Sequence, residues 1–271
     1  MENSNSKKGL VFLIVTAVIW GFACVGQVVG AGSMTPFYFN FSRYFLGSLS
    51  VIPLIFIFER GAHDKQMMKT SLIAGLMAGV ALFAASYVQQ VGISLTDSAG
   101  KGGFITGLYM IFVPIIGIFL GKKTGLQIWV GAGFAIHILI IDHFGQRMYS
   151  LRFAFVQFAT SAVLNCIGTF IFEDFALAPL KAALIPVLYC GIGSVGVAYT
   201  CQILGQKYSD PTSASVILST ESMFSAIGGA LILHERMTTQ GYIGCALIFI
   251  GIMLTQVNFD KFRCGKKSKA V

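Results

Sequence analysis

Charged side chains are scarce in this chain. Asp, Glu, Lys and Arg make up 11% of its 271 residues, while 55% of the residues are hydrophobic. A typical soluble domain carries about 25% charged residues. This chain has too little polar surface to cover a globule in water, so the composition excludes a soluble domain. The mean hydropathy of +0.77 agrees with a protein that lies in lipid.

Motifs for catalysis and metal binding are also missing. The six cysteines are dispersed, with no CxxC pair and no metal-ligand spacing. There is no nucleophile elbow, no phosphate loop and no carboxylate pair at acid–base spacing. The sequence therefore predicts neither an enzyme nor a bound metal or cofactor.

Positive charge exceeds negative charge, with a formal net charge of +8, but it is not gathered into a patch. Lys and Arg are scattered over loop ends and the C-terminal tail. Such scatter is typical of membrane orientation by the positive-inside rule rather than of nucleic-acid binding. We expect the bilayer and a small-molecule solute as partners and no nucleic acid, and a homodimer stays open.

Long apolar runs fill most of the chain. A spanning helix needs about 20 apolar residues. The predicted runs lie at 9–30, 36–58, 70–92, 99–120, 151–172, 182–204, 211–233 and 239–257, with a shorter one at 125–141. The first run follows Lys7 and Lys8 as in a signal peptide, but it is long and lacks a small-x-small cleavage site, so we expect a retained helix. The sequence predicts an all-α, multi-pass helix bundle in the cell membrane.

The two halves of the chain also resemble each other in sequence. At a shift of 113 residues, the segment 88–92 (VQQVG) falls on 201–205 (CQILG), and Asp97 falls on Asp210. At a shift of 114, the segment 20–23 (WGFA) falls on 134–137 (FAIH), and Arg43 falls on Gln157. Duplicated halves are typical of secondary transporters, whose substrate site lies at the repeat interface.

Several motifs carry a family resemblance. They are 19–21 (IWG), Phe39-x-x-x-Arg43-Tyr44, 101–109 (KGGFITGLY), 188–191 (LYCG), 198–202 (AYTCQ), 211–214 (PTSA), 221–222 (ES) and 234–236 (HER). In these motifs the chain resembles the EamA-type drug/metabolite transporters over nearly its whole length. The resemblance implies ten helices in two inverted five-helix repeats, cytoplasmic termini and alternating access without ATP.

The chain departs from that pattern in its middle. The family has two full helices between Gly121 and Arg152, whereas this chain offers only 125–141. The segment resembles the start of helix five joined to the end of helix six. We therefore expect two repeats, 1–131 and 132–271, with the fifth and sixth helices fused and about nine spans.

Two arrangements of 125–141 stay open. A single crossing fits its apolar content but inverts the second half and places the tail cations outside. A re-entrant or surface segment leaves eight full spans and keeps Lys122 and Arg147 on one side, as the positive-inside rule prefers.

Ionisable residues inside apolar runs are the sharpest site candidates, because a charge at bilayer depth is costly unless it faces a cavity or a partner. Glu221 could bind a substrate ammonium or a coupled proton, or it could be a buried carboxylate satisfied by Ser219, Ser222 or a neighbouring helix. Arg43 could bind a substrate carboxylate, pair with a protein carboxylate or extend to the interface.

Lys101 follows Asp97 at helical i,i+4 spacing, so an ion pair at the outer mouth is the alternative to cavity lining. Uncharged side chains complete the predicted substrate site, either as lining or as packing and interhelical hydrogen bonds. These are Trp20, Tyr87, Tyr109, Tyr199, Gln89, Gln157 and Gln202. For His137 a hydrogen-bonded core position is favoured over a proton relay.

The sequence thus predicts a secondary transporter, an exporter or permease of a small organic metabolite that works by alternating access. The alternative is a transport-incompetent deletion derivative that serves as a membrane interaction or scaffold protein or has no activity.

Overall fold

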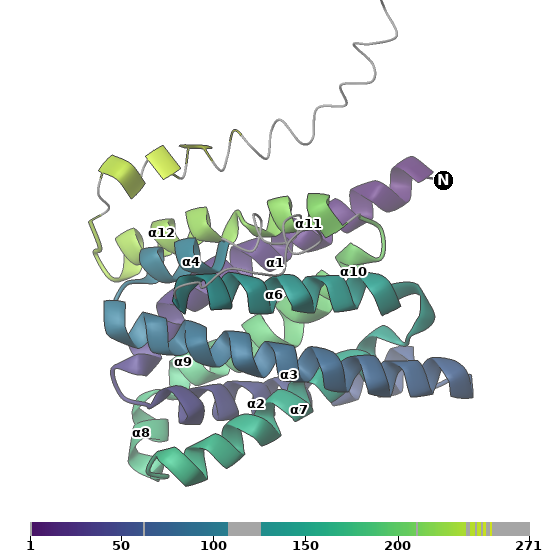
Figure 1. The fold of residues 1–271 in the computed structure, drawn as a ribbon, viewed down its shortest axis with the longest axis horizontal. Coiled ribbons are helices and arrows are strands. Elements are labelled where there is room, and N and C mark those ends of the chain that lie inside the picture. The colour runs from purple at the N-terminus through teal and green to yellow at the C-terminus, as the bar shows by residue number, and fades with distance from the viewer. Residues whose placement is uncertain are drawn as a thin grey trace, which may run out of the picture.

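The computed structural model describes residues 2–61, 63–107, 126–209 and 211–236, with 239–241, 243–244, 246–247 and 250. No strand occurs among these residues, so the predicted all-α class is confirmed for them. The helices are α1 (Glu2–Ala31), α2 (Pro36–Phe58), α3 (Lys65–Thr96), α4 (Ala99–Gly107), α6 (Leu126–Phe144), η1 (Gly145–Arg147), α7 (Ser150–Phe172), α8 (Leu177–Ala182), α9 (Leu184–Leu188), η2 (Tyr189–Ala198), α10 (Tyr199–Gln206), α11 (Pro211–Leu218) and α12 (Glu221–Ile232). Figure 1 shows them as one bundle.

Helices α2 and α7 form an antiparallel pair that is held at both ends by carboxylates. Glu59, which follows α2, accepts hydrogen bonds from the backbone N–H groups of Leu151 (2.8 Å) and Arg152 (3.1 Å) at the start of α7. Glu173, which follows α7, accepts from Phe37 (3.0 Å) and Tyr38 (2.9 Å) at the start of α2. The N-cap side chains Thr35 and Tyr149 make no capping hydrogen bond, so these carboxylates supply the missing acceptors.

The two capping carboxylates, Glu59 and Glu173, are related by the internal repeat. Adding 114 to Glu59 gives Glu173, and adding 114 to the segment 37–38 gives 151–152. Each repeat therefore caps the matching helix of the other, and the two helices run in opposite directions. This is the relation that an inverted repeat requires.

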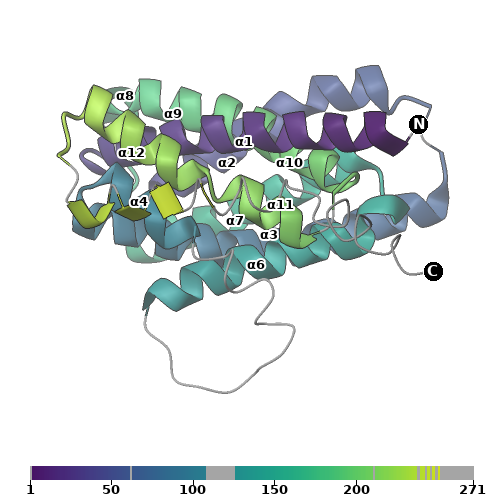
Figure 2. The same ribbon diagram turned by 90° about the horizontal axis from the view of Figure 1, so that it is seen from above.

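Around this pair the remaining helices pack in a closed bundle. Helix α3 lies against α7 and α6, and α1 lies against α12, α10 and η2. Figure 2 shows the same bundle from above, with α6 along α3. Glycines allow the closest approaches: Gly75 and Gly79 of α3 abut Val156 and Thr160 of α7.

Two predicted spans are wound irregularly in the structure. The run at 182–204 begins at the last residue of α8 and continues through α9, the π-helical η2 and α10, and the run at 211–233 is divided between α11 and α12. At this second break, the N–H groups of Thr220 and Ser222 bond three residues back, to Ile217 and Ser219, instead of four. Hydropathy shows where a helix lies in the membrane but not how its backbone is wound, so hydropathy alone predicts neither irregularity.

Six described helices are long and apolar enough to span a membrane. They are Lys7–Ala31, Pro36–Phe58, Lys65–Thr96, Ser150–Phe172, Leu184–Gln206 and Ser213–Ile232. The second part of the predicted run 99–120 and residues 251–271 lie outside the described residues. The count of nine spans and the fusion of helices five and six are not confirmed.

The start of α4 and the end of α6 lie at opposite ends of the bundle. Helix α4 begins beside Glu235, which accepts from the N–H of Ala99. Helix α6 ends at the opposite end of the bundle, where Gln146 donates to the carbonyl of Lys207 and Tyr149 accepts from the N–H of Asp64.

Candidate functional site

A small cavity lies in the middle of the bundle, between the two halves of the chain. Its volume is about 20 Å³. It is lined by Trp20, Ala23, Cys24 and Gln27 of α1, Arg43 of α2, Gln89 of α3, Thr106 of α4, Phe134 of α6, Ser194 of η2, Tyr199 of α10 and Glu221 of α12. Its lining therefore combines a guanidinium, a carboxyl group, two amides, hydroxyl groups and three aromatic rings.

Glu221 supplies the carboxyl group of this cavity. It is the first residue of α12, directly after the tight turn that separates α12 from α11. Its side chain is 3% exposed, and its Oε1 accepts no hydrogen bond from the described residues. The hydroxyl of Ser222 donates instead to the carbonyl of Gly103. A buried carboxylate oxygen without a donor is costly in a folded protein, which marks this position as a binding candidate.

Arg43 is the cationic group. It is 3% exposed, and its Nε donates to Asn40 Oδ1 at 2.8 Å. Asn40 is held in turn by the carbonyl of Ser86 on α3. The guanidinium carbon lies 4.9 Å from the ring centroid of Tyr44. Among the described residues the one ion pair within 4 Å joins Arg152 and Glu59, so Arg43 and Glu221 share a cavity without pairing with each other.

Amide groups line the cavity beside these charges. Gln89 Nε2 donates to the hydroxyl of Thr106 at 2.6 Å, which ties α3 to α4. Gln27 presents an Oε1 without a donor among the described residues, while its backbone carbonyl accepts from Gln90. The cavity therefore keeps hydrogen-bonding capacity that the described protein groups do not use.

Aromatic rings form another wall. Trp20 meets Tyr199 edge-on, with ring centroids 4.6 Å apart, and its Nε1 donates to the carbonyl of Ser194 in η2. Phe134 lines the same cavity and is the repeat mate of Trp20 at the shift of 114. The repeat thus places one ring from each half at the cavity.

Five of the predicted site residues line this cavity: Trp20, Arg43, Gln89, Tyr199 and Glu221. Gln157, the repeat mate of Arg43, instead hydrogen-bonds His137 at 2.8 Å, which places His137 in the favoured core role. Gln202 is buried away from the cavity lining. Tyr87 stacks on Phe37, with centroids 3.9 Å apart. Tyr109 lies outside the described residues.

Lys101 does not form the predicted ion pair with Asp97 within 4 Å. Asp97 ends α3 in a left-handed conformation (φ 46°), and α4 begins only at Ala99. The two residues are therefore not on one helix, and the i,i+4 rule does not apply to them. Lys101 is exposed at the end of the bundle and does not line the cavity.

Sequence reasoning missed six lining residues: Ala23, Cys24, Gln27, Thr106, Phe134 and Ser194. Two of them carried a usable signal. Gln27 is an amide near the end of an apolar run, and Phe134 is aligned with Trp20 by the repeat. The other four are small or ordinary residues whose exposure to the cavity depends on helix rotation.

Comparisons with known proteins agree with this architecture. The model of the EamA-like transporter family matches the chain twice, at residues 7–141 and 132–257. A protein of Archaeoglobus fulgidus named "Uncharacterized transporter" is 25% identical over 90% of this chain and 84% of its own length. "Uncharacterized transporter YoaV" of Bacillus subtilis is 23% identical over 94% of this chain and 98% of its own.

A solved crystal structure shares the fold, with a TM-score of 0.69 and 15% identity over 92% of this chain and 97% of the other. The family model matches twice, six helices of the described part of the chain are long and apolar enough to span a membrane, and the relatives are named as transporters. These findings identify a multi-pass integral membrane protein. The chain belongs to the EamA-like transporter family.

Proposed function

We propose that this protein is a secondary transporter, an exporter or permease, that moves a small zwitterionic organic metabolite of the amino-acid type by alternating access. The observation that carries the proposal is the placement of Arg43 and Glu221. They come from different halves of the chain and line one buried cavity without forming an ion pair. Opposite charges held apart match a solute that carries a carboxylate and an ammonium.

The chemistry of each group supports its role. A guanidinium binds a carboxylate through two parallel N–H donors, and Asn40 holds Nε of Arg43 and so fixes the side chain. Glu221 offers an acceptor to an ammonium, or to a proton whose release is coupled to transport. Gln27, Gln89 and the aromatic wall would contact the rest of the solute.

The small cavity volume supports a closed state in this proposal. About 20 Å³ accommodates little more than one water molecule, which is too little for an organic solute. Loading would require the two halves to move apart. The π-helical η2 and the turn before Glu221 are irregular backbone at the cavity wall, where transporters typically bend.

Uptake of labelled amino acids into proteoliposomes tests the proposal. We expect wild-type protein to transport at least one member of a panel that includes uncharged and singly charged analogues. Glu221→Gln keeps the shape of the side chain but removes its charge, and should lower transport about thirtyfold or more, as should Arg43→Gln. Asp174→Asn, in an exposed loop, is the matched control and should transport normally. Normal transport by Glu221→Gln would contradict the proposal.

The middle of the chain supports the second candidate, a transport-incompetent derivative. The two family matches overlap at 132–141, within the predicted fused segment between the proposed repeats 1–131 and 132–271. If wild-type protein transports no solute in the panel, a helix pair inserted between Gly131 and Phe134 should restore uptake. Wild-type uptake would exclude this candidate.

A further inference from the structure

We propose that an anionic phospholipid binds in a groove at the basic end of the bundle, between α2, α3 and α7. The groove consists of two neighbouring hollows of about 510 and 380 Å³ that share Ile55 and Arg152. Such volumes suit a ligand the size of a lipid headgroup with its glycerol. We call this surface the basic groove. It is far from the central cavity and shares no residue with it.

Four cations line the basic groove: Arg60, Lys65, Lys69 and Arg152. Lys65 and Lys69 lie one turn apart on α3 and so occupy one face of the helix. Within the described parts of the chain, Arg60, Lys65 and Lys69 form no ion pair. Their charges are therefore available to a phosphate group.

The two carboxylates at this site are already engaged. Glu59 accepts from the first backbone N–H groups of α7 and pairs with Arg152 at 3.8 Å. Asp64 accepts from the N–H groups of Gln66 (2.8 Å) and Met67 (3.0 Å) at the start of α3. Four cations thus face two carboxylates that serve as helix caps, and the groove carries a net positive charge.

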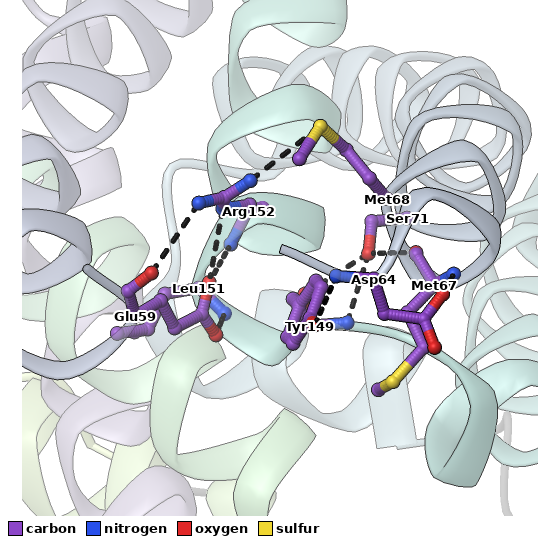
Figure 3. Close-up of polar contacts among 8 residues, drawn as sticks. All are labelled: Glu59, Asp64, Met67, Met68, Ser71, Tyr149, Leu151 and Arg152. Atoms are coloured by element: carbon purple, nitrogen blue, oxygen red, sulfur yellow. Dashed lines mark hydrogen bonds and ion pairs between the residues drawn. The ribbon is translucent and has the colours of Figure 1, made fainter. Parts of the chain in front are cut away.

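Arg152 is already positioned at the junction of the two hollows. Figure 3 shows its guanidinium between Glu59 and Met68. Nη2 donates to the carbonyl of Glu59 at 3.3 Å, and Nη1 lies 3.5 Å from the sulfur of Met68. The side chain is 24% exposed, so part of it remains accessible to a bound group.

The walls of the groove are apolar and lie on spanning helices. Phe56 of α2 is 68% exposed and Leu72 of α3 is 50% exposed, and both face the groove beside Phe155 and Val156 of α7. Cations at the helix ends next to an apolar wall on the helix flanks match an amphiphile, with a phosphate at the membrane surface and acyl chains below it. Basic pockets between spanning helices are known to bind anionic headgroups in this way.

Lipid binding to purified protein tests this proposal. Delipidated protein in neutral detergent is titrated with phosphatidylglycerol or with phosphatidylcholine of the same acyl chains, and bound lipid is counted by native mass spectrometry. We expect one phosphatidylglycerol to bind at least tenfold more tightly than phosphatidylcholine. Lys65→Gln/Lys69→Gln should weaken the phosphatidylglycerol complex about tenfold to thirtyfold at low salt. Leu72→Gln keeps the charges and should weaken both lipids.

Lys181→Gln/Arg236→Gln removes two exposed cations from the opposite end and is the matched control, with binding expected as in wild type. Equal affinity for the two lipids, or unchanged affinity in Lys65→Gln/Lys69→Gln, would overturn the proposal. Complete displacement of bound phosphatidylglycerol by millimolar inorganic phosphate would also overturn the proposal, because it would indicate a site for the free anion rather than for a lipid.

Discussion

The four glutamates whose side chains the structure describes occupy two kinds of environment. Glu59, Glu173 and Glu235 each accept hydrogen bonds from backbone N–H groups at the start of a helix. In each case that helix belongs to the other half of the chain. Glu221 is itself the first residue of a helix, yet one of its oxygens has no donor among the described residues. The first three stabilise the fold, and the contrast supports a binding role for Glu221.

Glu59 and Glu173, the two helix caps that the repeat relates, should each stabilise the protein independently. Glu173→Gln replaces one of two acceptor oxygens by an amide NH2 that faces backbone donors, so it should destabilise the protein by about 1–2 kcal/mol. Glu59→Gln should do the same and also removes the ion pair with Arg152. Thermal unfolding in detergent measures both effects, with Asp174→Asn as the control.

The double variant Glu59→Gln/Glu173→Gln should show the sum of the single effects. The caps lie at opposite ends of helices of 23 residues, roughly 35 Å apart, and sites so distant act independently. Loss of stability no greater than in Asp174→Asn would show that these carboxylates do not hold α2 and α7 together.

At the scale of elements, the contact between α4 and α12 depends on glycine. A Cβ at Gly103 would overlap the side chain of Ser225. Gly103→Ala should therefore destabilise the bundle by about 1–3 kcal/mol through overpacking. A Cβ at Gly92 of α3 would meet no heavy atom within 4 Å beyond its own turn of helix, so Gly92→Ala should be neutral or stabilise by up to about 1 kcal/mol. Equal unfolding temperatures for the two variants would contradict the close packing.

Apolar periodicity and length predicted most helices well. The predicted run 36–58 coincides with α2, and 151–172 begins one residue after α7 does. Apolar periodicity did not predict the irregular winding at η2 and before Glu221, because that winding depends on which backbone carbonyl each N–H reaches. The sequence showed part of the relation between the two repeats. The shift of 114 residues that aligns Arg43 with Gln157 also aligns Glu59 with Glu173.

The candidate site was predictable only where a polar or aromatic residue stood out in an apolar run. Arg43 and Glu221 were found in this way. Tyr87 and Gln202 have the same chemistry but lie away from the cavity, because helix rotation directs them elsewhere. Hydropathy does not report that rotation. Helix rotation also places Ser194 and Cys24 at the cavity, although nothing in the sequence marks these two residues as lining residues.

At the scale of the whole molecule, the antiparallel α2–α7 pair fixes which connections share a side of the membrane. Cysteines introduced by Gly61→Cys and Arg147→Cys into a cysteine-free protein should react with an impermeant thiol reagent from one side, and Lys181→Cys from the other. A Cβ fits freely at Gly61, and Arg147 and Lys181 are exposed. Labelling of Gly61→Cys and Arg147→Cys from opposite sides would favour nine crossings with an inverted second half.

The native Cys24 gives the most direct test of alternating access to the central cavity. Cys24 lines that cavity, whereas Cys190 is equally buried but packs outside it, against Ala23 and Gly26. In proteoliposomes, a protein with Cys24 as its single cysteine should react with a small water-soluble thiol reagent, and the transported solute should slow the reaction. The matching protein with Cys190 alone should stay unreactive. If Cys24 reacts no faster than Cys190 until the protein is unfolded, the cavity never opens to water and the account is wrong.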